Sequence, residues 1–389
     1  MSLNYLELPP EVVEALHLEE KEEVEVVLDH QGLLFKSRSP IAHSRLSNWG
    51  LLACSILLTL LVYGLSFVQS GAQVNLVGKI SIMSYLVMIG FPVGMLIFVI
   101  GLIRNRDYFS DNLTKGVFLR ILPVLTVALT LIVGLLLLGV AWLLHQVFLG
   151  ASFDHLTASM IFLTLSFALN NLLLQLSKEI KASWLGQLFT VVIISGVLLA
   201  MATNSNKKWW QVNLSFLGTE NANDAWGFNL TLILSAFIFF AFVDYLFVAL
   251  KQRFPKSKRL LILRVLLSLL AVDLGLVGYF PNNASSHVIH TRFAGYLVYL
   301  IIALIISVPW LMPKADKDFT LSSYAVGLVL ILVEIAYQGI GYLSLTSFEI
   351  IAFLLAFTWV FRLLNRLQEL IFTNRKVFTL KLTSERTND

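Results

Sequence analysis

Ten apolar stretches of about 20 residues each, separated by short polar segments, make up most of this chain from residue 49 onward. A helix of about 20 apolar residues is long enough to cross the hydrocarbon core of a bilayer, which is about 30 Å thick. The stretches cover residues 49–68, 82–103, 120–145, 156–176, 184–203, 230–250, 260–279, 291–312, 323–343 and 348–367. The pattern predicts an all-α polytopic membrane protein with ten transmembrane helices.

The composition excludes a soluble globular protein. Charged residues make up 13% of the chain, whereas soluble domains carry about 25%, and the mean hydropathy is +0.80. The single cysteine, Cys54, lies inside an apolar stretch and has no second cysteine to pair with. A disulfide scaffold and a thiolate metal cluster are therefore excluded as well.

Lysine and arginine are distributed asymmetrically over the segments that join the stretches. With the amino terminus inside and ten crossings, 24 of the 28 Lys and Arg residues fall on the inner side. The outer side keeps only Lys79, Lys207, Lys208 and Arg292. Because cations accumulate in cytoplasmic loops, this partition supports ten spans with both termini in the cytoplasm. The absence of a signal-peptide pattern ahead of residue 49 agrees with that orientation.

Residues 1–40 form a segment of different character, with nine acidic residues against three basic ones. Residues 5–8 read as a short strand, and Pro9 and Pro10 begin a helix, as proline does at a first turn. Residues 24–28 alternate between apolar and polar, and residues 33–35 return after a turn at Gln31 and Gly32. We expect a small α/β cytoplasmic domain of strand, helix and hairpin.

This segment has a family resemblance of its own. The runs Leu6-Glu-Leu-Pro-Pro-Glu-Val-Val-Glu-Ala-Leu-His-Leu18, Glu23-Val-Glu-Val-Val-Leu-Asp29 and Gly32-Leu-Leu-Phe35 resemble the AbrB-like swapped-hairpin family over residues 4–38. The resemblance implies an intertwined homodimer, and many members bind DNA through basic residues. The acidic balance here repels phosphates, and residues 18–23 lack the glycine turn that the family carries. We expect a homodimer through residues 1–40 and no nucleic-acid partner, or else a small acidic extension that folds without swapping.

The membrane part divides into a four-helix region over residues 46–181 and a six-helix region over residues 184–370, followed by a cytoplasmic tail, 371–389. Two outer segments of the six-helix region carry a second resemblance. They are Asn213-Leu-Ser-Phe-Leu-Gly-Thr-Glu220 with Trp226-Gly-Phe-Asn229, and Gly278-Tyr-Phe-Pro-Asn-Asn283 with Ser286-His-Val-Ile-His290. They resemble the bacterial multi-span family known as domain of unknown function 998. The resemblance implies a six-helix unit of a bacterial cytoplasmic membrane, without an established activity.

Three carboxylates lie within the predicted spans. An Asp at the centre of a transmembrane helix costs about 2.5 to 3.5 kcal/mol on insertion scales, so such residues are candidates for function. Asp273 and Glu334 fall near the middle of their spans, where proton or cation coupling and a structural hydrogen bond are the two alternatives. Asp244 lies toward the inner end of its span, where it is expected either to extend toward water or to meet nearby lysine and arginine.

A polar cluster of His287, His290 and Arg292 is expected on the outer face. Zinc sites of hydrolases use about three protein ligands and a bound water, so His287 and His290 are candidate metal ligands, with Asp273, Ser215 or Asp224 nearby. The alternative is a polar cap on the start of the eighth span.

Other sequence signals for chemistry are absent. The chain contains no Gly-x-Ser-x-Gly elbow, no phosphate-binding loop ending in Gly-Lys-Ser/Thr and no HExxH motif. Gly90 and Gly94 form a GxxxG spacing, and Asn170, Asn171, Gln187 and Gln338 are expected to join helices. No cofactor is expected unless the zinc alternative holds.

The sequence favours a transporter-like or lipid-interacting membrane protein, with membrane lipids as partners, over an enzyme. Two alternatives remain. One is an outer-face metal-dependent membrane hydrolase, and the other is a non-catalytic regulatory or scaffold subunit that dimerises through residues 1–40.

Overall fold

The computed structural model describes residues 23–29, 32–37, 48–106, 115–312, 316–372 and 376–381. The chain forms two compact units. One unit combines residues 1–47 with residues 369–389, so it joins the two ends of the chain, and the other contains residues 48–368. Each unit is described by itself below.

Within the described residues, ten helices are long and apolar enough to cross a membrane, which confirms the predicted number. Seven are single α-helices: α2 (Asn48–Gln69), α6 (Lys115–Val147), α7 (His155–Glu179), α9 (Ala225–Arg253), α10 (Lys258–Tyr279), α11 (His287–Leu311) and α13 (Leu345–Phe372). Three include a second helical type: α3 (Ile82–Tyr85), η1 (Leu86–Gly90) and α4 (Phe91–Arg104); η2 (Ala182–Trp184) and α8 (Leu185–Thr203); and α12 (Lys317–Glu334) and η6 (Ile335–Gly339).

Shorter elements occupy the segments between the spans. They are β3 (Val74–Asn75), β4 (Ser152–Phe153), η3 (Ser205–Lys207), η4 (Trp209–Gln211) and η5 (Leu214–Gly218). The strands β3 and β4 pair antiparallel and tie together the ends of α2 and α7. The three 3₁₀ turns form the long segment between α8 and α9.

Side-chain caps set where several helices begin. Asp154 precedes α7, and its Oδ1 accepts hydrogen bonds from the backbone amides of Leu156 and Thr157, both at 3.0 Å. Hydrogen bonds from Thr157 hold the pKa of the Asp154 carboxyl below its usual value. Asp316 caps α12 in the same way, through the amide of Phe319 at 2.7 Å. Such caps satisfy amides that have no partner within the helix.

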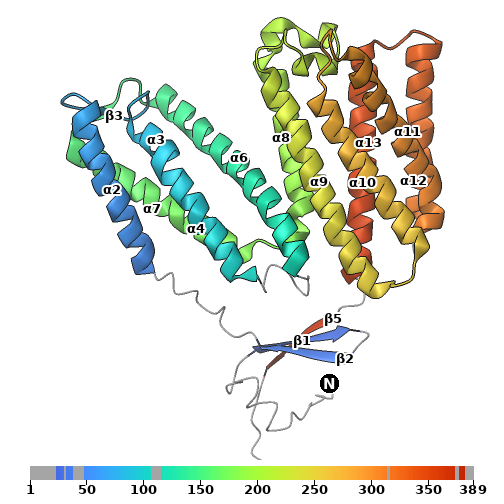
Figure 1. Cartoon of the computed structure of the whole chain (residues 1–389), viewed down its shortest axis with the longest axis horizontal. Helices are drawn as coiled ribbons and strands as arrows, with labels where there is room; N and C mark the ends of the chain where they lie inside the picture. The colour runs from blue at the N-terminus through green and yellow to red at the C-terminus, as the bar shows by residue number, and fades with distance from the viewer. Residues whose placement is uncertain are drawn as a thin grey trace, which may run out of the picture. The chain divides into compact units, whose positions relative to one another are not determined.

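Small residues allow α4 to lie close against α7 in the four-helix region (Figure 1). A Cβ added at Gly94 would lie 2.8 Å from Asn170 Oδ1, and one at Gly101 would lie 2.2 Å from Ser177 Oγ. Asn170 is fully buried and donates to Ser55 Oγ of α2 at 3.3 Å. The predicted GxxxG spacing therefore packs helices, and Asn170 joins α7 to α2, as expected for small and polar residues between membrane helices.

The α3–α4 span changes its helical type just before Pro92. Proline has no amide hydrogen to donate to the preceding turn, and η1, immediately ahead of it, is a π-helical turn that ends at Gly90. The helix ahead of Pro92 thus forms one wide turn.

Helix α9 lies at the centre of the six-helix region. It packs against α8 and α10, and also against α6 of the four-helix region. Within its most apolar window 72% of the residues are buried, compared with 11% for α12. Phe189 of α8 stacks on Phe239 of α9 and contacts Phe357 of α13, so aromatic side chains join α13 to the rest. Helices that are apolar all round are typically buried in this way.

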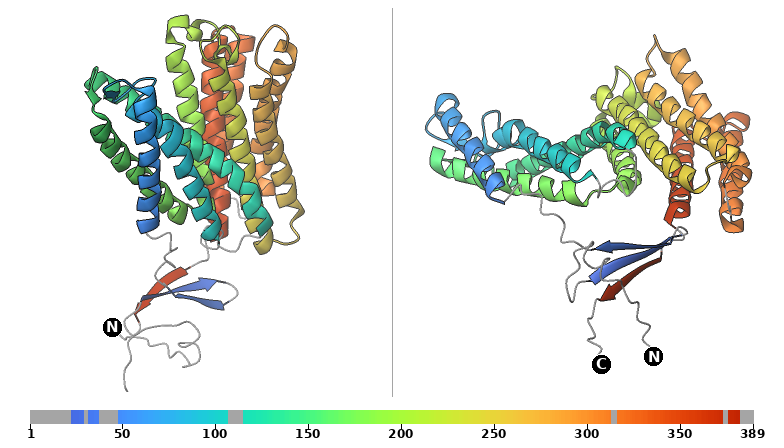
Figure 2. Two further views of the ribbon diagram at one scale, coloured as in Figure 1. Left: turned by 60° about the vertical axis from the view of Figure 1, so that its left-hand side comes forward. Right: turned by 60° about the horizontal axis from the view of Figure 1, so that its bottom comes forward.

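The terminal unit contains a three-stranded antiparallel sheet in the order β2-β1-β5 (Figure 2). Strands β1 (Glu23–Asp29) and β2 (Gly32–Ser37) form the hairpin that the sequence indicates. Strand β5 (Lys376–Lys381) comes from the carboxyl-terminal tail, where no strand is expected from the sequence, and it pairs Val26 with Phe378. The predicted strand at residues 5–8 and the helix after it lie outside the described residues, so the α/β domain stays a prediction.

Candidate functional site

Asp273 is a buried carboxylate on α10 with only 5% of its surface exposed. It lies six residues before the end of the helix at Tyr279, which at 1.5 Å per residue is about 9 Å. This position is nearer the carboxyl-terminal end of the span than the mid-membrane depth expected from the sequence. Its Oδ2 has no hydrogen-bond partner among the described residues. Asp273 is therefore an ionisable side chain in an apolar helix, and one of its carboxyl oxygens lacks a hydrogen-bond partner among the described residues.

Glu334 occupies a different environment. It is half-buried and is the last residue of α12, where the helix passes into the π turn η6. It is also closer to the carboxyl-terminal end of its span than expected, because the span ends five residues later at Gly339. Helix α12 packs on α11 rather than α10. No described hydrogen bond or ion pair joins Glu334 to Asp273, so the described contacts do not bring the two carboxylates into one site.

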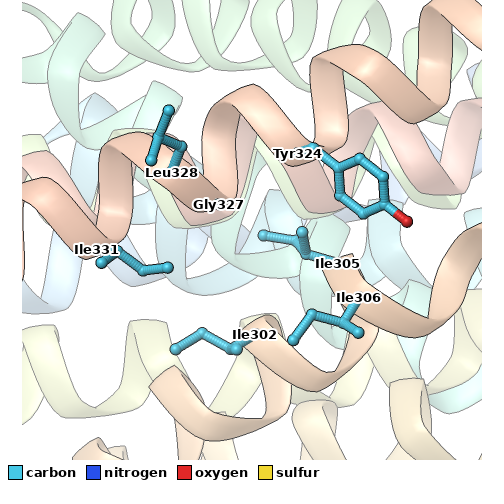
Figure 3. A pocket seen from close by; sticks show the side chains of 7 residues that line it. All are labelled: Ile302, Ile305, Ile306, Tyr324, Gly327, Leu328 and Ile331. Carbon is cyan, nitrogen blue, oxygen red and sulfur yellow. The ribbon is translucent and has the colours of Figure 1, made fainter.

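An apolar groove lies between α11 and α12 (Figure 3). Its seven lining residues are Ile302, Ile305, Ile306, Tyr324, Gly327, Leu328 and Ile331. The groove has a volume of about 200 Å³, and the Tyr324 hydroxyl is the one polar side-chain group among these seven residues (Figure 3). Neither Asp273 nor Glu334 lines this groove.

Asp244 is the buried carboxylate of α9, with 8% of its surface exposed. Arg264 of α10 donates to its Oδ1 at 2.8 Å. The guanidinium of Arg120, on α6, lies 2.9 Å from Oδ2, at ion-pair distance although outside hydrogen-bond orientation. Asp244 thus meets basic side chains, as expected for its position, and links α6, α9 and α10.

His290 lies in the first turn of α11 and is buried, since only 5% of its surface is exposed. Its Nδ1 is 2.7 Å from the backbone carbonyl of Phe280, and its Nε2 is 3.2 Å from Ser215 Oγ. A carbonyl oxygen only accepts, so Nδ1 carries a proton. In the neutral imidazole, the free lone pair is then on Nε2, which faces Ser215.

Glu349 completes this cluster from the second turn of α13. Its Oε2 accepts a hydrogen bond from the Leu214 amide at 2.5 Å, and the Ser215 hydroxyl lies 3.3 Å from its Oε1. Both Ser215 and Glu349 are half-buried. Three parts of the chain that are distant in sequence, namely η5, α11 and α13, therefore meet at one hydroxyl group.

His287 and Arg292 do not join this cluster through any described hydrogen bond or ion pair. His287 Nδ1 lies 2.6 Å from Asn282 Oδ1, and Arg292 is exposed. The described residues contain no group of three or more His, Cys, Asp or Glu side chains that could hold a metal ion. His287 and His290 thus bond to different partners, and no third potential ligand joins them among the described residues.

No sequence pattern marks Glu349 as a site residue. Its only sequence signal is an acid in the first turn of an otherwise apolar span, which is also a common position for a helix-stabilising acid. Its contact with Ser215 depends on the fold, because 134 positions separate the two residues. Ser215 itself was expected near the outer histidines, and its contact with His290 agrees with that expectation.

The comparison with protein families gives one match. Residues 187–364 match the model of the family described as "Protein of unknown function (DUF998)". This agrees with the resemblance expected for residues 184–370. The match does not reach residues 4–38, where the AbrB-like resemblance stays a prediction. No curated protein and no solved structure matches the chain. The six-helix part of this multi-pass membrane chain is thus similar to a family whose description names no activity.

Proposed function

We propose that this protein is transporter-like and that it binds a proton or a cation at Asp273. The observation that carries the proposal is the buried Asp273 carboxyl whose Oδ2 lacks a hydrogen-bond partner among the described residues. An ionisable side chain within a membrane helix costs several kcal/mol unless it is paired or neutralised. A proton or a small cation removes that cost, and exchange of this ligand couples Asp273 to transport.

The surroundings of Asp273 support this assignment. Helix α10 packs against α9 on one side and α11 on the other, and Val277, one turn beyond Asp273, is also buried. The carboxyl therefore lies between helices rather than facing lipid. Glu334 is a separate candidate, since it lies beside a π turn, a feature that is frequent at functional sites.

The test is ligand-dependent stability of the full chain in lipid nanodiscs. A ligand that binds only the folded state stabilises it by about 2.7 kcal/mol at one hundred times its Kd. We expect the melting temperature of the wild type to respond to pH or to Na⁺, K⁺ or Li⁺, and Asp273→Asn to lose that response. Asp244→Asn is the matched control, because Asp244 already has two arginine partners. An unchanged response in Asp273→Asn contradicts the proposal.

A second candidate function, lipid binding, is favoured by the groove between α11 and α12. The groove lies within two spans and is lined almost entirely by aliphatic side chains. The apolar material at this depth of a bilayer is lipid acyl chain, so an acyl chain is the natural occupant of the groove.

Photoreactive acyl chains test lipid binding. In nanodiscs, we expect cross-links at Ile306 and Leu328 in the groove to exceed those at Leu57 and Leu60 of α2, which are more than 60% exposed but outside the groove. Equal cross-linking at both places would show ordinary lipid contact and remove this candidate.

We also propose that both ends of the chain lie on the cytoplasmic side of the membrane. An even number of crossings brings both ends to one side, and the pairing of β1 with β5 requires the two ends to meet. In a Cys54→Ala background, we expect Lys256→Cys to resist an impermeant maleimide in intact cells and Asn221→Cys to react. The reverse pattern would invert the topology.

The predicted homodimer through residues 1–40 is tested by the mass of the protein in nanodiscs with and without that segment.

A further inference from the structure

We propose that Ser215 and His290 form a nucleophile and base pair that acts on acyl esters at the outer membrane surface. The proposal is independent of the role of Asp273. It differs from the zinc-dependent alternative because its nucleophile is the serine hydroxyl and its base is a histidine, with no metal in either role.

The orientation of the imidazole supports the pair. The Phe280 carbonyl lies 2.7 Å from His290 Nδ1 and holds the proton on that nitrogen. The opposite nitrogen, Nε2, then presents its lone pair to Ser215 Oγ at 3.2 Å. A base that is held in one tautomer and lies within hydrogen-bond reach of a hydroxyl is the arrangement that activates a serine. A carboxylate holds the corresponding histidine nitrogen in the Ser-His-Asp triad, whereas a backbone carbonyl does so here.

His290 is more deeply buried than Ser215, and this difference suits a fixed base beside a nucleophile. His290 is 5% exposed, so its ring is fixed by the surrounding protein. Ser215 is half-buried, so part of this residue is exposed. An immobile base beside a partly exposed serine favours reaction with an external substrate over a purely internal hydrogen bond.

The position of Ser215 indicates the class of substrate. It lies in η5, in the segment between α8 and α9. The same segment carries Trp210, and Trp226 lies in the first turn of α9. These two tryptophans are 48% and 70% exposed. Exposed tryptophans at helix ends lie at the level of lipid headgroups. The ester bonds of membrane lipids occupy that level, so we assign acyl esters of lipids or lipid-linked molecules as the substrate class.

The reaction balances with water as the co-reactant. Ser215 Oγ bonds to the ester carbonyl carbon while its proton passes to His290 Nε2. The bond from carbon to the alcohol oxygen then breaks, and His290 gives its proton to the departing alcohol. Water attacks the acyl-serine, again losing a proton to His290. That proton returns to Ser215 Oγ as the acid leaves.

Glu349 competes for the same hydroxyl. When the Ser215 hydroxyl donates to Glu349 Oε1 at 3.3 Å, its proton is unavailable to His290. Substitutions of the two acceptors, Glu349 and His290, should therefore affect the activation of the Ser215 hydroxyl differently. Removing the charge with Glu349→Gln leaves the hydroxyl to His290, whereas His290→Gln removes the base.

A fluorophosphonate probe tests the pair on the full chain in nanodiscs, since it forms a bond from phosphorus to an activated serine oxygen and releases fluoride. We expect labelling mapped by mass spectrometry to Ser215. Labelling should fall at least tenfold in His290→Gln, disappear in Ser215→Ala and persist in Glu349→Gln. Ser286→Ala is the matched control, because Ser286 lies on the same outer face and donates to the Pro281 carbonyl. It should label like the wild type.

The pH profile separates a base from a structural contact. The labelling rate of the wild type should rise with pH as the imidazolium loses its proton, and this rise should be absent from the residual rate of His290→Gln. Melting curves of each variant exclude unfolding as the cause of lost labelling. A folded wild-type protein that is not labelled at Ser215 overturns the proposal. Loss of labelling in Glu349→Gln with retention in His290→Gln overturns the assignment of His290 as base.

Discussion

Two buried aspartates on neighbouring helices, Asp244 of α9 and Asp273 of α10, have opposite surroundings. Asp244 meets Arg264 at 2.8 Å and Arg120 at 2.9 Å. Asp273 is buried to a similar degree, but its Oδ2 has no hydrogen-bond partner among the described residues. The same residue type on two neighbouring helices thus has two different surroundings: the protein itself neutralises one carboxylate, and we propose that the other is left for a ligand.

The arginine partners of Asp244 also show how the parts of the membrane unit are joined. Asp244 forms ion pairs with Arg120 of α6 and Arg264 of α10. Through these pairs, α9 is tied to the four-helix region and to its neighbour in the six-helix region. A paired buried charge is expensive to break because its partners are left without a counterion. An unpaired one is expensive to keep. The two residues therefore predict opposite effects on stability when the charge is removed.

The largest effect is expected from Asp244→Ala. It leaves the Arg120 and Arg264 guanidinium groups without their shared carboxylate, and breaking a buried pair typically costs about 3 to 5 kcal/mol. Both arginines are partly exposed, so we expect about 2 to 3 kcal/mol of lost stability, after discounting for solvent screening. Unfolding in nanodiscs measures it. A loss below about 0.5 kcal/mol would make Asp244 no different from a surface charge.

The next effect has the opposite sign. Asp273→Asn replaces a carboxyl that has an unpartnered oxygen with a neutral amide of nearly the same size, which removes the cost of burying an ionisable group. We expect unchanged stability or a gain of about 1 kcal/mol, the lower part of the range for burying unsatisfied polar groups, in buffer without the ligand. The same unfolding measurement compares it directly with Asp244→Ala. A loss as large as that of Asp244→Ala would mean that Asp273 holds a structural contact.

A neutral buried group sharpens the comparison. Asn170 is as buried as the aspartates and donates to Ser55. Hydrogen bonds between membrane helices contribute about 0.6 kcal/mol on average, so Asn170→Ala should cost about that amount plus its packing. The free energy of unfolding checks it. A cost above that of Asp244→Ala would show that packing at α7, rather than charge pairing, dominates the unit.

The smallest effect is expected at an exposed ion pair. Asp316 pairs with Arg366 of α13, and both side chains are more than a third exposed. Asp316→Asn keeps a side-chain oxygen that can cap α12 and removes the charge. Exposed pairs contribute about 0 to 1 kcal/mol and are screened by salt. We expect a change of less than about 1 kcal/mol that shrinks further in high salt, and a larger or salt-insensitive change would contradict this interpretation.

The sequence predicts the ten spans well, because each is a long apolar stretch whose length is set by the bilayer. It also predicts the packing roles of Gly94 and Asn170, since small and polar residues within apolar helices have few other uses. Asp244 is predicted to meet cations because lysine and arginine accumulate near the inner ends of spans.

The depth of Asp273 and the cluster at Ser215 are less accessible from sequence. Helix α10 ends only six residues beyond Asp273, and an apolar stretch alone does not reveal where a helix ends. The contact between Ser215 and Glu349 joins η5 to α13, and no local pattern encodes it. Strand β5 was missed for a similar reason, because its pairing partner is β1, near the opposite end of the chain.

The most direct test of the central claim is infrared difference spectroscopy of the protein in nanodiscs, recorded while pH or cation concentration is changed. The carbonyl stretch of a protonated carboxyl group reports its own protonation. The account predicts a carboxyl band that changes in the wild type and in Asp244→Asn but is absent from Asp273→Asn. The same band in Asp273→Asn as in the wild type would contradict the assignment of Asp273 as the ligand-binding carboxylate.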